Sequence, residues 1–144
     1  MAEQKITTFL WFDTQAEEAA KFYVSIFKGD SKVISANPMS ATFELAGQRY
    51  LALNGGPSRK FNEAISLFVS CEDQAEVDRF WDALIAGGGS PSQCGWLKDK
   101  YGLSWQIIPK RLMELMGDPK VVQAMLGMQK IVVADLERAH GGKS

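Results

Sequence analysis

The residues best suited to chemistry gather between positions 93 and 109. Cys94 could serve as a nucleophile or a redox centre if a neighbouring group lowered the pKa of its thiol. No histidine stands nearby in the sequence, so Lys98 or Lys100 would have to assist, and strand alternation places Lys98 on the same face as Cys94. Cys94 is therefore a candidate catalytic residue, although we favour the alternative that it is a small buried residue in a strand.

Three polar residues complete this stretch. Asp99 could act as a general acid or base, but its place at a predicted hairpin turn favours a solvated turn carboxylate. Ser104 and Gln106 alternate with Leu103 and Trp105, so the two polar side chains share one face of a strand. Polar groups between apolar neighbours indicate the wall of a cavity.

A β-hairpin is needed to position these residues. Residues 94–97 and 103–108 have the composition of strands, and the segment 99–102 between them ends in a glycine, as turns often do. Pro109 ends the second strand because it has no backbone N–H to donate to a sheet. The hairpin closes the second of two similar regions of the chain.

Two tetrapeptides reveal this repetition. Thr14-Gln-Ala-Glu17 and Asp73-Gln-Ala-Glu76 lie 59 residues apart, and each follows a β-branched or aromatic segment, at residues 5–12 and 64–71. Both have the spacing of a capping box at the start of an amphipathic helix. We therefore expect two related modules that share a core, since neither would bury its sheet alone.

The remaining elements complete a β-α-β-β-β order in each module. After the first helix, short strands are predicted at residues 32–36, 41–45 and 48–54. The expected organisation is a single domain of residues 1–144 with modules at 5–56 and 64–109 and a helical tail at 110–140. In the tail, Asp118-Pro119 begins one amphipathic helix whose apolar stripe extends to Leu136 and which either covers its own sheet or contributes to a dimer contact.

Composition excludes several classes of function. A chain of 144 residues with 46% hydrophobic and 23% charged residues is typical of one globular domain, and a net charge of −1 gives no electrostatic basis for binding nucleic acid or an anionic membrane. No apolar run approaches the roughly 20 residues that span a bilayer. Without an export signal, Cys71 and Cys94 are expected to be free thiols in a cytoplasmic protein, with Cys71 structural.

Strand alternation also predicts a pocket. Its walls would combine aromatic and polar side chains from the first and last strands of the modules, a combination typical of small-molecule sites. The expected lining residues are Thr7, Phe9, Trp11, Asn54, Ser66, Phe68, Ser70, Ser104 and Gln106. The alternative is that Phe9, Trp11 and Phe68 merely fill a closed core.

Four segments carry a resemblance to a known family: Leu10-Trp-Phe-Asp13, Ala16-Glu-Glu-Ala-Ala-Lys-Phe-Tyr23, Cys71-Glu-Asp-Gln-Ala-Glu76 and Cys94-Gly-Trp-Leu-Lys-Asp-Lys-Tyr-Gly102. With them, the chain resembles the PhnB-like family, labelled 3-demethylubiquinone-9 3-methyltransferase-like, of the glyoxalase/bleomycin resistance/dioxygenase (vicinal oxygen chelate) superfamily. The resemblance implies an α+β fold in which two βαβββ modules form curved mixed sheets around a cavity, usually in a homodimer. A C-terminal helix is expected in addition.

The resemblance also implies where a metal or a cofactor would bind. Metalloenzymes of the superfamily carry His, Gln or Glu ligands at positions that fall here near Thr7, near Ala52 or Asn54, at Ser66 and at Gln106. Hydroxyl and amide oxygens are weak ligands for a transition metal, so no catalytic metal is expected. A methyltransferase that uses S-adenosylmethionine usually needs a glycine-rich turn between a strand and a helix, and none is visible. No cofactor is therefore expected.

The leading hypothesis is a homodimer that binds a small molecule in its sheet cavity without a metal and binds neither nucleic acid nor membrane. Whether it catalyses a reaction stays open. The alternatives are an enzyme, either a lyase or dioxygenase or the 3-demethylubiquinone 3-methyltransferase of the family label, and an interaction module with a filled cavity. The pocket could lie within one chain or between two.

Overall fold

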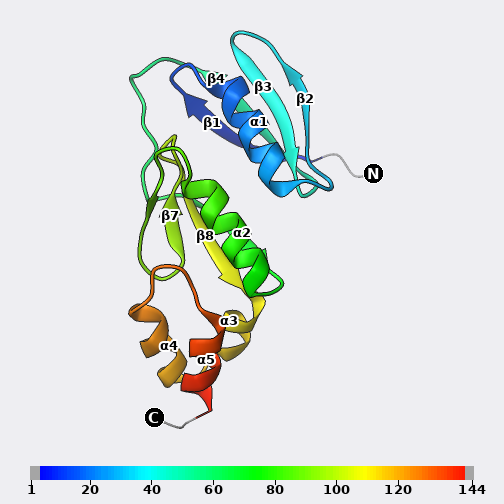
Figure 1. The fold of residues 1–144 in the computed structure, drawn as a ribbon. Helices are drawn as coiled ribbons and strands as arrows, with labels where there is room; N and C mark the ends of the chain where they lie inside the picture. Colours follow the sequence, from blue (N-terminus) through cyan, green and yellow to red (C-terminus); the bar gives the residue numbers. More distant parts are fainter. Residues whose placement is uncertain (1–3, 142–144) are drawn as a thin grey trace. The chain divides into compact units, whose positions relative to one another are not determined.

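A computed structural model describes residues 4–141 of the chain. The chain divides into two compact units, the first ending at Phe61 and the second beginning at Asn62. Each unit contains a four-stranded mixed sheet and a helix that follows its first strand (Figure 1). The predicted α+β class and the repeated βαβββ order are confirmed. Within the described residues, every helix is too short or too polar to traverse a bilayer.

The first unit matches its predicted elements closely. Its elements are β1 (Thr8–Phe12), α1 (Ala16–Phe27), β2 (Lys32–Ala36), β3 (Ser40–Leu45) and β4 (Gln48–Asn54). The strand order is β1-β4-β3-β2, in which β1 runs parallel to β4 and the other neighbours are antiparallel. One face of this sheet is covered by α1, as Figure 1 shows.

Alternation explains how the first unit buries its core. In β1, Leu10 and Phe12 are buried, whereas the preceding residue, Phe9, is exposed. Because side chains alternate along a strand, the face that carries Leu10 and Phe12 is the one that packs on the helix. On the helix, Ala19 and Ala20 are completely buried. Because their side chains are small, the helix can pack closely on the sheet, and the other sheet face stays open.

The start of α1 differs from the prediction. The helix begins at Ala16, and its N-cap residue, Gln15, makes no capping hydrogen bond with its side chain. Instead, the side-chain Oδ1 of Asn54 accepts a hydrogen bond from the N–H of Ala16 at 2.8 Å. The predicted capping box at Thr14 is therefore wrong, because an oxygen from β4 supplies the cap.

The second unit repeats the arrangement. Its elements are β5 (Ser66–Cys71), α2 (Gln74–Ile85), β6 (Ser90–Pro91), β7 (Trp96–Lys98) and β8 (Ser104–Pro109). The strand order is β5-β8-β7-β6, with β5 parallel to β8. Here the predicted cap is confirmed, since the side chain of Asp73 accepts a hydrogen bond from the N–H of Glu76 at 3.0 Å.

The tail forms three short helices where the sequence predicts one. They are α3 (Lys110–Leu115), α4 (Pro119–Leu126) and α5 (Val133–His140). The Asp118-Pro119 start is confirmed, because Asp118 accepts a hydrogen bond from the N–H of Lys120. The predicted long helix is wrong, because α4 ends at Leu126 and Gly127 caps it. The tail packs on the second unit through a core cluster of Ile108, Leu112, Leu115, Val121, Ile131 and Leu136.

Two connections fasten the tail to the second unit. The side-chain amide of Gln74 donates to the carbonyl oxygen of Ile131 at 3.0 Å and accepts from the N–H of Val133 at 2.7 Å. At Gly95, a Cβ atom would lie 2.7 Å from the side chain of Ile108 and 3.1 Å from that of Ile131, and φ is +86°. The tail therefore lies so close to this turn that only glycine fits.

Candidate functional site

Cys94 lies in a turn rather than in the predicted strand. The strand β7 begins at Trp96, and the backbone of Cys94 is left-handed, with φ of 58°. Its N–H donates to the carbonyl oxygen of Met128 at 2.8 Å. The predicted strand face shared by Cys94 and Lys98 is therefore wrong, because alternation does not extend through this turn.

Asp99 is buried, with 2% of its surface exposed, so the predicted solvated turn carboxylate is also wrong. Its Oδ1 accepts hydrogen bonds from the N–H groups of Tyr101 at 2.8 Å and Leu103 at 3.1 Å. Its Oδ2 accepts one from the indole N–H of Trp105 at 2.9 Å. These donors compensate the desolvation of the carboxylate. Asp99 thus fixes the turn between β7 and β8 and orients Trp105.

The second cysteine, Cys71, is completely buried at the end of β5. Burial disfavours the thiolate and, with the nearby carboxylate of Glu76, raises the pKa of the Cys71 thiol to about 12. The thiol is protonated at neutral pH, which fits the structural role expected for it.

The open face of the second sheet, opposite α2, carries a row of polar residues. Strand register places Ser66, Ser104, Lys98 and Ser90 directly opposite one another across β5, β8, β7 and β6. We call these four residues the polar row. Opposite residues in neighbouring strands point to the same face, about 5 Å apart at Cβ. Three serines and one lysine therefore follow one another across this face.

The next row of the open face is more apolar. Phe68 and Trp96 flank Gln106 in the register, and the Gln106 amide donates to the hydroxyl of Ser66 at 2.9 Å. Two residues further along β8, Ile108 belongs to the core cluster that the tail covers. On this face, the side chains at the start of β8 are polar. At the end of β8 they are apolar, and the tail covers them.

A pocket of about 240 Å³ opens on this face, and all of its lining comes from the second unit. The lining residues are Glu63, Ser90, Pro91, Ser92, Trp96, Leu97, Lys98 and Ser104. Three residues of the polar row are among them. The pocket therefore combines an aromatic wall with convergent polar groups, as small-molecule sites do.

One ion pair lies at this pocket. The ammonium group of Lys98 contacts the Oε1 of Glu63, and both side chains are substantially exposed, at 40% and 64%. The hydrogen bond from Lys98 is the main reason why the pKa of the Glu63 carboxyl is lowered. Exposed ion pairs of this kind contribute only about 0–1 kcal/mol to stability. The pair can therefore exchange partners at low cost.

Of the predicted pocket residues of the first unit, Thr7, Phe9 and Trp11 alternate onto its open face. Asn54 stands opposite the core residue Phe12 on the α1 side, so its predicted place in the pocket is wrong. Phe9 is 56% exposed, whereas Thr7 and Trp11 are half-buried. The side chain of Asn54 is engaged with backbone, accepting from Ala16 and donating to the carbonyl oxygen of Pro38 at 3.0 Å. Asn54 therefore has a structural role in holding the start of α1.

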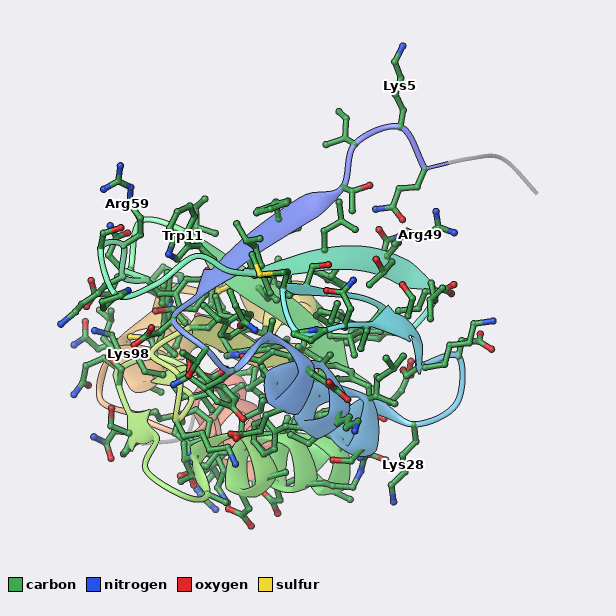
Figure 2. The ribbon with its side chains drawn as sticks, turned by 90° about the horizontal axis from the view of Figure 1, so that it is seen from above. Lys5, Trp11, Lys28, Arg49, Arg59 and Lys98 are labelled. Carbon is green, nitrogen blue, oxygen red and sulfur yellow. The ribbon has the colours of Figure 1, made fainter. Side chains whose placement is uncertain are left out.

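Trp11 is held by the loop that follows β4. Its indole N–H donates to the carbonyl oxygen of Gly56 at 2.9 Å, and a Cβ atom at Gly55 would lie only 2.3 Å from its ring. The guanidinium group of Arg59 lies 6.0 Å from the ring centre, and Figure 2 shows the two side chains next to each other. Such a cation over an aromatic face is attractive.

In the second unit, Ser104 is the predicted pocket residue that lines the 240 Å³ pocket. Ser66 and Gln106 lie on the same face, hydrogen-bonded to each other, and Phe68 is 50% exposed. Sequence reasoning missed Glu63 because a turn residue before a strand gives no periodic signal. It missed the pocket role of Lys98, although alternation with Trp96 could have indicated it.

The residues at the superfamily's metal positions do not fit a transition metal. Ala52 has no side-chain donor atom, Asn54 caps α1, and the Ser66 hydroxyl is paired with the Gln106 amide. Residues 4–141 contain no group of three or more His, Cys, Asp or Glu side chains that could hold a metal ion. The oxygens at these positions are therefore weak ligands for a transition metal.

The glycines likewise differ from a cofactor-binding turn. The connection between β1 and α1, at residues 13–15, contains no glycine. Gly55 packs against Trp11 after β4, and Gly87 follows α2 with φ of +80°. Each of these glycines has a local structural reason.

Comparison with known proteins gives concordant results. The profile of a family described as 3-demethylubiquinone-9 3-methyltransferase matches residues 4–108. A solved structure described as a putative 3-demethylubiquinone-9 3-methyltransferase, PhnB protein, from Bacillus cereus is 35% identical, with a TM-score of 0.67 over 74% of this chain and 99% of that chain. No curated protein sequence matches the chain.

More distant structures share the fold. A protein of Pseudomonas aeruginosa is 20% identical, with a TM-score of 0.60 over 74% of this chain and 98% of its own. The fosfomycin resistance protein FosX of Listeria monocytogenes, solved with Mn(II) and sulfate, is 15% identical, with a TM-score of 0.54 over 73% of this chain and 88% of its own. The chain shares its fold with these distant structures, and it belongs to the PhnB-like family described as 3-demethylubiquinone-9 3-methyltransferase.

Proposed function

We propose that this chain binds a small molecule on the open face of its second sheet and does so without a transition metal. The observation that carries the proposal is the 240 Å³ pocket between an apolar wall, formed by Trp96 and Pro91, and the polar row. An apolar wall supplies affinity by removing ligand surface from water, and the polar groups fix its orientation. The absence of suitable donors at the superfamily's metal positions supports the metal-free form of the proposal.

The enzyme alternatives have less support. A metal-dependent lyase or dioxygenase would need ligands stronger than the Ser66 hydroxyl and the Gln106 amide, which already bond to each other. Methyl transfer would need a site for its cofactor, and the turn between β1 and α1 lacks the glycines that let a backbone approach one. Binding alone accounts for the residues present.

Two measurements on the same preparation test the proposal. Elemental analysis after dialysis against Mn²⁺, Fe²⁺ and Zn²⁺ should find far less than one metal ion per chain, both in the parent and in Gln106→Ala. Screening small aromatic fragments by amide NMR should then give binders that shift the signals of Trp96 and Ser104. Near-stoichiometric metal that is lost in Gln106→Ala would favour the metalloenzyme instead.

We further propose that the chain forms a homodimer. The edge strands β1 and β5 carry, on or just before them, the exposed apolar residues Ile6, Phe9, Ile65 and Phe68. The pairs correspond at the 59-residue offset of the repeat. Edge strands with exposed apolar side chains are disposed to pair with another chain. Light scattering should give the mass of two chains, and the mass of one chain at micromolar concentration would contradict the proposal.

A further inference from the structure

The hydroxyl of Ser104 is the unusual polar group of the pocket. Ser104 is 1% exposed, and its Oγ has no hydrogen-bond partner among residues 4–141. Its neighbour in the register, Ser66, is by contrast bonded to Gln106 at 2.9 Å. A buried hydroxyl without a partner costs free energy, so native proteins rarely keep one without a reason. Ser104 lines the pocket, where a ligand atom could pair with it.

Lys98 stands directly opposite Ser104 in the register of β7 and β8. Its ammonium group is engaged by the carboxylate of Glu63, a residue of the segment before β5. The chain thus places one of its own carboxylates at the pocket, on the ammonium group of the residue opposite Ser104. Figure 2 labels Lys98 among the side chains. A carboxylate group evidently fits at this position.

We propose that the pocket selects a ligand with an anionic headgroup, a carboxylate or a phosphate, which replaces Glu63 on Lys98 and accepts a hydrogen bond from Ser104. This inference rests on the proposed small-molecule binding. The anion gains a charge-assisted contact with the ammonium group, and the Ser104 hydroxyl gains the partner that it lacks. The carboxylate of Glu63 returns to water, where an exposed carboxylate is well solvated. Glu63 is therefore an internal competitor that lowers the apparent affinity.

The apolar wall indicates what the headgroup is attached to. Trp96 and Pro91 border the same pocket, and an indole face favours a flat apolar body. Benzoate and phenyl phosphate combine a ring with the two headgroups and serve as probes. Benzamide has the shape of benzoate without its charge and is the matched neutral probe.

Amide NMR titrations of the full chain test the proposal. Benzoate or phenyl phosphate should bind at least about tenfold more tightly than benzamide, because the neutral amide gains no ion pair. The tighter of the two anions identifies the headgroup. Lys98→Met should weaken anion binding at least about tenfold. Lys100 is a nearby exposed lysine, and Lys100→Met should leave anion binding unchanged. Glu63→Gln should tighten anion binding about threefold, because the ligand then no longer has to displace an exposed ion pair.

Ser104→Ala supplies an independent readout. It should weaken binding of the anion about tenfold, because a hydrogen bond to a charged acceptor is lost. It should not lower the melting temperature, because the hydroxyl it removes has no partner to lose. Ser35→Ala, an exposed serine on β2 of the first unit, is the control.

The outcomes separate this inference from the proposed function. If benzamide binds as tightly as benzoate, or if Lys98→Met and Ser104→Ala bind the anions like the parent, anion selection is overturned and small-molecule binding stands. If neither the anions nor benzamide shift any pocket signal while fragment screening finds no other ligand, both proposals fail.

Discussion

Asp99 and Ser104 are buried polar residues of the same hairpin, and their oxygens have opposite surroundings. Asp99 accepts hydrogen bonds from two backbone N–H groups and an indole, whereas the Ser104 hydroxyl has no partner within residues 4–141. A satisfied buried carboxylate stabilises the fold, while an unpaired hydroxyl costs stability until something binds it. Asp99 therefore stabilises the hairpin, whereas Ser104 serves the proposed ligand binding.

Asp99→Asn should lower the free energy of unfolding by about 1–3 kcal/mol. The amide oxygen can still accept from Tyr101 and Leu103, but the NH₂ group then faces the indole N–H of Trp105, so two donors meet. Urea unfolding followed by circular dichroism measures the change.

Two further variants identify the cause of that loss. Adding Trp105→Phe to Asp99→Asn should cost less than the sum of the two single changes, because phenylalanine has no N–H to oppose the amide. Asp82→Asn, on the exposed side of α2, should change stability by less than about 0.5 kcal/mol. Equal effects of Asp99→Asn and Asp82→Asn would contradict the role of Asp99 in the turn.

Among the elements, those set by local pattern were predictable. The strands expected at residues 32–36 and 48–54 appear with these bounds, because β-branched and aromatic runs between turn residues suffice to define them. The starts of α1 and α2 show that local sequence predicts only some helix caps. Asp73 caps α2 as its tetrapeptide predicts, yet the matching Thr14 does not cap α1, since Asn54 reaches the helix from β4. A cap supplied from a distant strand leaves no local signal.

The tail shows the same limit. The apolar spacing after Asp118 suits one helix, but α4 ends at Leu126 and the chain then runs back to the Cys94 turn. The N–H groups of Cys94 and Gly95 donate to the carbonyl oxygens of Met128 and Gln129, both at 2.8 Å. Extended contacts of this kind replace helical hydrogen bonds and cannot be inferred from periodicity.

Gln74 should hold this returning segment in place. Gln74→Ala removes the donor to Ile131 and the acceptor for Val133, leaving two backbone groups unpaired, and should cost about 1–3 kcal/mol. Hydrogen exchange should accelerate most at residues 128–136. Gln123→Ala, on an exposed position of α4, is the matched control, and equal exchange in both variants would show that Gln74 is not a clamp.

For the whole molecule, the boundary of the family match and the boundary of the second unit differ. The family profile ends at residue 108, whereas the second unit continues through the tail. The sequence marked Ser66, Ser104 and Gln106 on one face by alternation alone. It predicted a pocket but not that Glu63 and Pro91 line it, because a turn residue and a two-residue strand have no periodic signature.

The tail should therefore be part of the second unit's core rather than an appendage. Ending the chain after Pro109 uncovers Ile108, leaves the N–H groups of Cys94 and Gly95 without their acceptors and should destabilise the second unit by about 2–4 kcal/mol. Exchange measured segment by segment should accelerate in residues 62–109 and stay unchanged in residues 4–61. A chain ended after His140, which keeps all three helices, is the control. Unchanged protection of β7 and β8 in the shorter chain would mean that the fold of the second unit is complete without its tail.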